Sequence, residues 1–89
     1  MTVETVLEKV KELCENYGAS EIVLYGSRAK GTALERSDID VAVSGVKDFS
    51  SLEEAVEMIP TLYTVDLLDL DSCRNELLME DIRKYGRKV

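Results

Sequence analysis

The sequence predicts an α/β (α+β) protein in which helices pack on a small mixed β-sheet, in the order α-β-β-α-β-α. Three observations lead to this class. Apolar residues at helical spacing open the chain, three short runs of apolar and β-branched residues follow, and capping residues precede two further helical segments. With 89 residues, the chain is expected to form one domain over residues 1–89.

A helix is expected first, over residues 3–17. Its apolar positions form one stripe, and Gly18 fits the position just after a helix C-terminus. Two strands follow. "EIVLYG" at residues 21–26 is typical of a buried strand, and "DIDVAVSG" at residues 38–45 is predicted to be the second. The stripe of the first helix consists of Val3, Val6, Leu7, Val10, Leu13, Cys14 and Tyr17.

Another helix is predicted over residues 48–60, where two Ser–Glu pairs have the spacing of a capping box. The third strand is "LYTVDLLDL" at residues 62–70, which is rich in β-branched and apolar residues. A last helix is expected to start at a cap formed by Asp71 or Ser72 and to end near Gly86. The two candidate capping boxes are Ser51 with Glu54 and Ser50 with Glu53.

Composition indicates a folded globular protein, because 45% of the residues are hydrophobic and 33% are charged. No apolar run approaches the ~20 residues of a membrane-spanning helix. The N-terminal "MTVETVLEKVKEL" also lacks the apolar stretch of a signal peptide. We therefore expect a cytoplasmic protein that does not use a membrane. The formal net charge of −7 argues against direct nucleic-acid binding and favours either a protein partner with a basic face or a phosphate ligand bound through metal ions.

The chain has no histidine and only two cysteines, Cys14 and Cys73, which do not form a CxxC motif. A zinc site would need more ligands than these. Both cysteines are expected to be reduced thiols, one of them in a helix core. Any acid–base chemistry must then come from carboxylates, lysine, tyrosine or water.

The segment "GSRAKG" directly follows the first predicted strand and is a candidate nucleotide-binding loop. Gly26 and Gly31 permit a positive φ and leave no Cβ in the path of a ligand. Ser27 adds a hydroxyl, and Arg28 and Lys30 add positive charge, which suits a polyphosphate. The segment has neither P-loop nor dinucleotide-binding spacing, so a plain surface turn is the alternative interpretation.

Asp38 and Asp40 stand two positions apart at the start of the second strand. Side chains alternate along a strand, so both should project from one face while Ile39, Val41 and Val43 enter the core from the other. Two carboxylates held side by side repel each other. A divalent cation removes that repulsion, and Mg²⁺ favours carboxylate oxygens together with water and substrate phosphate.

A third acid is available in the third strand. Asp66 and Asp69 have opposite parity there, so only one of them can share a face with the first two acids. We select Asp66, because it lies inside the strand whereas Asp69 lies towards its end. An edge-strand charge that prevents aggregation is the alternative for Asp66. Three carboxylates beside a phosphate-binding loop would suit phosphoryl transfer with two metal ions.

These residues resemble a known pattern. Gly26 and Ser27, ten intervening residues, and then Asp38, Ile39 and Asp40 are similar to the signature of the DNA polymerase beta-type nucleotidyltransferase superfamily. The stretch "GSRAKGTALERSDIDVAV" most resembles its smallest members, the minimal nucleotidyltransferases (MNT proteins). "VDLLDLD" resembles the strand that carries their third aspartate. The resemblance spans nearly the whole chain and implies a nucleotidyltransferase fold.

The resemblance also implies roles for individual residues. Gly26 and Ser27 would contact the nucleotide phosphates, and Asp38 and Asp40 would bind two Mg²⁺ ions. Asp66 would share the catalytic ion and help to activate the acceptor hydroxyl. ATP would be the substrate. Members of this family often continue past the region of "GRKV" as another short strand.

MNT proteins are commonly encoded beside a HEPN protein, a helical RNase-like toxin. The resemblance therefore implies an antitoxin that transfers AMP from ATP to a protein hydroxyl, in particular a toxin tyrosine. A second hypothesis is a binding module that neutralises its partner by contact alone. A third is a nucleotidyltransferase that acts by itself on an antibiotic or RNA, which the small size of the chain disfavours.

Overall fold

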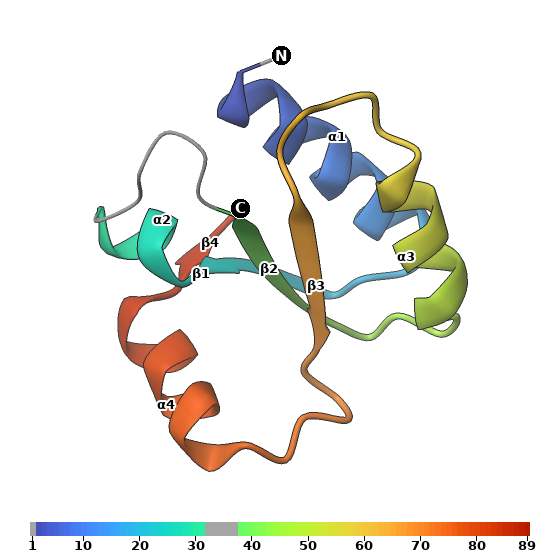
Figure 1. Ribbon diagram of the computed structural model, residues 1–89. Helices are drawn as coiled ribbons and strands as arrows, with labels where there is room; N and C mark the ends of the chain where they lie inside the picture. The colour runs from blue at the N-terminus through green and yellow to red at the C-terminus, as the bar shows by residue number, and fades with distance from the viewer. Residues whose placement is uncertain (1, 32–37) are drawn as a thin grey trace.

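The computed structural model describes residues 2–31 and 38–89. Helices and strands alternate along these residues (Figure 1). In chain order the elements are α1 (Val3–Asn16), β1 (Glu21–Tyr25), α2 (Ser27–Lys30), β2 (Ile39–Ser44), α3 (Phe49–Glu57), β3 (Val65–Asp69), α4 (Glu76–Tyr85) and β4 (Arg87–Lys88).

The four strands form one mixed sheet in the order β3-β2-β1-β4. β1 runs antiparallel to β2 and to β4, whereas β2 and β3 run parallel, joined by the crossover helix α3. The predicted fold class is confirmed. The predicted order of six elements is retained, but two short elements were not predicted. One is α2, a single helical turn within "GSRAKG", and the other is the two-residue strand β4.

Helices cover both faces of the sheet. α1 and α3 lie on one face and α4 lies on the other (Figure 1). The main core lies under α1 and α3, and Ile39, Val41 and Val43 of β2 are fully buried in it, as their alternation predicts. A smaller cluster, formed by Val23, Ala42 and Ile82, lies under α4. The buried members of the main core are Val6, Val10, Cys14, Ile22, Leu24, Ile39, Val41, Val43, Leu52 and Val56.

Helix α1 has a capping residue at its N-terminus and a glycine just after its C-terminus. Thr2 caps its N-terminus by accepting a hydrogen bond from the backbone N–H of Thr5 at 3.2 Å. At the other end, Gly18 has a φ of +90° and follows the C-cap residue Tyr17. This left-handed conformation favours glycine, so the predicted stop at Gly18 is confirmed.

The predicted N-terminal caps of the two later helices are wrong. Asp48, not a Ser–Glu capping box, caps α3, because its carboxylate accepts both the N–H of Ser51 (3.2 Å) and the hydroxyl of Ser51 (2.7 Å). α4 is capped by Asn75, which accepts from the N–H of Leu78 at 3.1 Å. Asp71 is engaged elsewhere and accepts from the hydroxyl of Ser44 and the N–H of Gly45.

Both cysteines are free thiols. Cys14 is buried in the main core, and this burial raises the pKa of its thiol to about 11. The thiol therefore stays protonated at neutral pH and acts as a small apolar side chain. Within the described part of the chain, every helix is too short or too polar to cross a membrane.

Candidate active site

Two of the three predicted acids lie at paired strand positions, and the third lies just before one of these strands. In the parallel pairing of β2 with β3, Asp40 stands directly opposite Asp66. Asp38 immediately precedes β2, two residues before Asp40. Asp40 alternates with the buried Val41, so its side chain is on the α4 face, whereas the main core is on the other face. Asp69 stands opposite Val43 in the same register.

The charges of these acids act on one another. The pKa of Asp40 is raised above its ordinary value, first because the carboxylate is partly buried, and then because the negative charges of Asp66 and Asp38 are close. Asp38 and Asp66 are exposed, whereas Asp40 is half-buried. Ionisation of Asp40, the most buried of the three carboxylates, is therefore disfavoured.

The donor set fits a divalent cation. Within residues 2–31 and 38–89, no three Asp, Glu, Cys or His side chains are already gathered closely enough to hold a metal ion. However, Asp40 is destabilised by the charges of both other acids, and a bound Mg²⁺ would relieve that repulsion. Carboxylate oxygens are also the ligands that Mg²⁺ prefers in proteins. These residues fit Mg²⁺ by their chemistry.

Gly26 lies between β1 and α2, against one of the acids. Its φ is +76°, and a Cβ at this position would collide with the Oδ2 atom of Asp40. Glycine is therefore required here for two reasons, the left-handed backbone and the close approach of the Asp40 carboxylate. Gly31 ends the segment with a φ of +75°, but a Cβ there would meet open space.

Of the other predicted nucleotide-binding residues, the structure describes the side chain of Arg28 but not those of Ser27 and Lys30. The backbone of Ser27 and Lys30 belongs to α2, but their side chains lie outside what the structure describes. Arg28 is half-buried and lies over the ring of Tyr63, with 5.2 Å between its Cζ atom and the ring centroid. Tyr63 packs against the main core, so this contact is on the α1 side of the sheet. The acids are on the opposite side.

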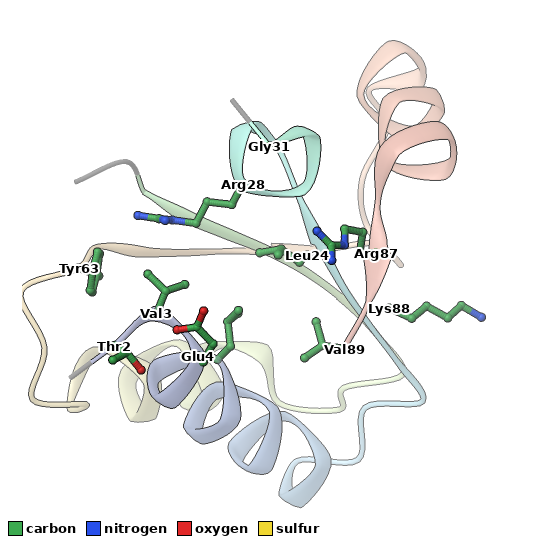
Figure 2. A pocket seen from close by; sticks show the side chains of 11 residues that line it. Thr2, Val3, Glu4, Leu24, Arg28, Gly31, Tyr63, Arg87, Lys88 and Val89 are labelled. Carbon is green, nitrogen blue, oxygen red and sulfur yellow. The ribbon is translucent and has the colours of Figure 1, made fainter. Parts of the chain in front are cut away.

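Arg28 and Tyr63 both line a pocket of about 730 Å³ (Figure 2). Its apolar part comes from α1 and β1, including Val3, Leu7 and Leu24, and Arg87 of β4 adds a second guanidinium. None of the three acids lines this pocket. The pocket and the acid cluster are therefore two separate features on opposite faces of the sheet.

Tyr25 was missed by the sequence reasoning. It is the last residue of β1, stands opposite Asp40 in the antiparallel pairing, and packs with the cluster under α4. Its burial, the charges of Asp40 and Asp66, and Cys73 raise the pKa of its hydroxyl to about 12. The hydroxyl therefore remains a proton donor beside the acids at neutral pH. Strand parity together with its position next to Gly26 is the signal that could have found it.

Comparison with known proteins agrees with this geometry. The family described as "Nucleotidyltransferase domain" matches residues 6–85, so the chain belongs to the nucleotidyltransferase domain family. The family resemblance and the enzyme class expected from the sequence are confirmed.

The names of individual relatives are more specific than the description of the family. Protein adenylyltransferase MntA of Thermococcus cleftensis is 34% identical over 79 residues, which cover 83% of this chain and 79% of that protein. A structure assigned as a minimal nucleotidyltransferase covers all of this chain and 97% of its own, with 28% identity and a TM-score of 0.76. A crystal structure of a toxin–antitoxin with AMP-PNP matches 91% of this chain and 69% of its own, with 26% identity and a TM-score of 0.67.

Proposed function

We propose that this protein transfers AMP from ATP to a hydroxyl of a partner protein, with Mg²⁺, and that it acts in this way as an antitoxin. The expected partner is a HEPN-type helical toxin, and the expected acceptor is one of its tyrosines. Three findings support the proposal: the family of the chain, a relative named a protein adenylyltransferase, and a similar toxin–antitoxin structure with an ATP analogue.

One observation carries the proposal most directly. The parallel pairing of β2 and β3 sets Asp40 opposite Asp66, and the pKa of Asp40 responds to the charges of both Asp66 and Asp38. A protein that used this surface only for contact would gain nothing from three mutually repelling carboxylates. A phosphoryl-transfer enzyme needs such a group to hold metal ions at the reacting phosphate.

The reaction is a substitution at the α-phosphorus of ATP. The acceptor oxygen forms a bond to that phosphorus, the bond to the oxygen that bridges to the β-phosphate breaks, and pyrophosphate leaves. The proton of the acceptor hydroxyl passes to the Asp66 carboxylate and then to water. Two Mg²⁺ ions held by Asp38, Asp40 and Asp66 would supply stabilisation of the negative charge on the phosphates.

The segment from Gly26 to Lys30 would receive the triphosphate. Gly26 leaves room for a close approach of the backbone, and Ser27 and Lys30 supply a hydroxyl and a positive charge. Tyr25 keeps its proton at neutral pH, so it would add a neutral donor beside the acids without adding to their charge.

The partner follows from charge and from the consequence of the reaction. The chain carries a net charge of −7, which favours a partner with a basic surface, as an RNA-cutting toxin would have. Attachment of AMP brings a phosphate to the toxin. That negative charge would oppose the binding of RNA phosphates and so reduce RNase activity.

The test uses the full chain and the product of the neighbouring reading frame, expected to be a helical protein with an Arg-x4–6-His motif. Both are incubated with ATP and Mg²⁺, and the intact mass of the partner is measured. We expect the partner to gain one or more AMP groups, with one pyrophosphate released for each. Chelation of the metal should stop the reaction.

Two variants sharpen this test. Asp40→Asn should abolish the gain of mass, whereas Asp71→Asn, which changes an acid outside the cluster, should preserve it. A partner whose mass stays constant, and whose RNase activity still falls on mixing, would support neutralisation by contact alone and overturn the transferase proposal.

A further inference from the structure

The contact between Arg28 and Tyr63 connects two parts of the chain that carry the proposed site. Arg28 is the second residue of α2, two residues after Gly26, whereas Tyr63 lies in the segment that leads into β3. The Cζ atom of Arg28 is 5.2 Å from the ring centroid of Tyr63, and the Nε atom of Arg28 is shielded from solvent. A guanidinium over an aromatic face is attracted to it, and more strongly where water is excluded.

Tyr63 is itself held in place. It packs against the main core, and its N–H donates to the Thr61 hydroxyl at 3.1 Å. The next residue, Thr64, accepts a hydrogen bond from the N–H of Ile39 at 2.8 Å, at the start of β2. The residue that follows Tyr63 is thus hydrogen-bonded to the start of β2, the strand that carries Asp40. Tyr63 stands three residues before Asp66.

The orientation of Arg28 follows from the same contacts. The pocket that holds Arg28 and Tyr63 is lined by α1, β1 and β4 on the side of the main core (Figure 2). The acids are on the α4 side, where the cluster of Val23, Ala42 and Ile82 lies. A guanidinium stacked on Tyr63 therefore faces away from the surface where the triphosphate would bind.

We propose that Tyr63 is a positioning residue. Through its ring it holds Arg28, and through Arg28 it holds α2, so that Gly26 and Ser27 keep a fixed place relative to Asp40 and Asp66. This inference rests on the proposed function for its effect on ATP. In this proposal Arg28 does not make the phosphate contact that the sequence predicted, but orders the loop that contacts the phosphates.

The experiment is a double-mutant cycle on ATP binding by the full chain with Mg²⁺, measured by calorimetry. Tyr63→Leu and Arg28→Met should each weaken ATP binding roughly three- to tenfold, the size expected for loss of a cation–π contact. The loss in the double variant should be clearly smaller than the sum of the two single losses, because both changes remove the same contact. Tyr63→Phe keeps the ring and should bind ATP like the wild type.

A second measurement does not need ATP. Hydrogen exchange of the backbone amides of residues 27–31 should become faster in Tyr63→Leu and stay unchanged in Tyr63→Phe. Losses of ATP affinity that add in the double variant would show that Arg28 acts on ATP independently of the ring, and would overturn the proposal. Unchanged exchange in Tyr63→Leu would overturn it as well.

The failure of this inference and the failure of the proposed function are distinguishable. If the wild-type chain does not bind ATP or modify its partner, the proposed function fails, and hydrogen exchange alone decides whether Tyr63 orders α2. If the wild-type chain is active and Tyr63→Leu matches it in affinity and in exchange, only the positioning role fails.

Discussion

The two faces of the sheet use the same strands for different purposes. On the face under α1 and α3, Ile39, Val41 and Val43 are fully buried in the main core. On the other face, Asp40 lies on β2 between two of these residues and stands opposite Asp66. Among the residues that the structure describes, the apolar cluster on the α4 side is the smaller of the two. The main core therefore lies on one face of the sheet and the acids lie on the other. Neighbouring residues of β2 belong to the two different faces.

This comparison teaches how an 89-residue chain accommodates a charged site. A small domain buries a modest core, so it cannot lose much apolar burial without unfolding. Because alternate residues of a strand point to opposite faces, the acids can be added without removing any side chain from the main core. The cost appears instead at Asp40, whose pKa is raised first by partial burial and then by the negative charges of Asp66 and Asp38.

The largest expected effect comes from a substitution on the face that holds the main core. Ile39→Ala removes a fully buried side chain next to Asp40 and should reduce the free energy of unfolding by about 2–5 kcal/mol. Such a loss is a large part of the stability of a small domain. Urea denaturation followed by circular dichroism measures it. A loss below about 1 kcal/mol would show that the core is not concentrated on this face.

The next largest effect is expected at Gly26, which lies against the carboxylate of Asp40. Gly26→Ala introduces a side chain at a φ of +76° and forces the Asp40 carboxylate to move, so it should cost about 1–3 kcal/mol and weaken ATP binding. Gly31→Ala is the matched control, because its φ of +75° gives similar strain in open space. Equal losses of stability and of ATP binding in both variants would rule out a specific role for the Asp40 contact.

A smaller effect, of opposite sign, is expected at Asp40. Its folded pKa is raised, so ionisation of Asp40 destabilises the fold as the pH rises from the unfolded pKa through the folded pKa. Without metal, Asp40→Asn should therefore be as stable as the wild type or more stable at pH 7. The advantage should vanish at pH values below the ordinary aspartate pKa. Thermal melting over a pH series checks this, and a lower melting temperature of the variant at pH 7 would contradict it.

The smallest expected effect concerns Asp71, which sharpens the contrast with Asp40. The Ser44 hydroxyl and the Gly45 N–H donate to this exposed carboxylate and lower its pKa. Its contribution to stability is therefore present above the unfolded pKa and is lost as the pH falls through the folded pKa. Asp71→Asn should melt slightly below the wild type at pH 7 and converge with it in acid. A melting temperature above that of the wild type at pH 7 would be inconsistent with these hydrogen bonds.

The sequence alone determined the features that depend on local spacing. The alternation in "DIDVAV" predicted which β2 residues enter the core and which face holds the acids, because strand geometry has a period of two. The apolar stripe of α1 was predicted from the helical spacing of its apolar residues, and its stop was predicted from the glycine at position 18. Parity showed that only one of Asp66 and Asp69 can share a face with the other acids, and the position of Asp66 inside the strand led to its selection. Neither observation could give the register that sets Asp66 opposite Asp40.

Only the tertiary structure decided the contacts between distant segments. The closeness of Gly26 to Asp40, the Arg28–Tyr63 contact, and the engagement of Asp71 by β2 each join residues that are far apart in the chain. Such contacts depend on how the strands pair and how the helices pack on the sheet. No short stretch of sequence specifies that arrangement. The same cause explains why Asp71 was wrongly expected to cap α4: a carboxylate binds whichever donors the fold brings nearest.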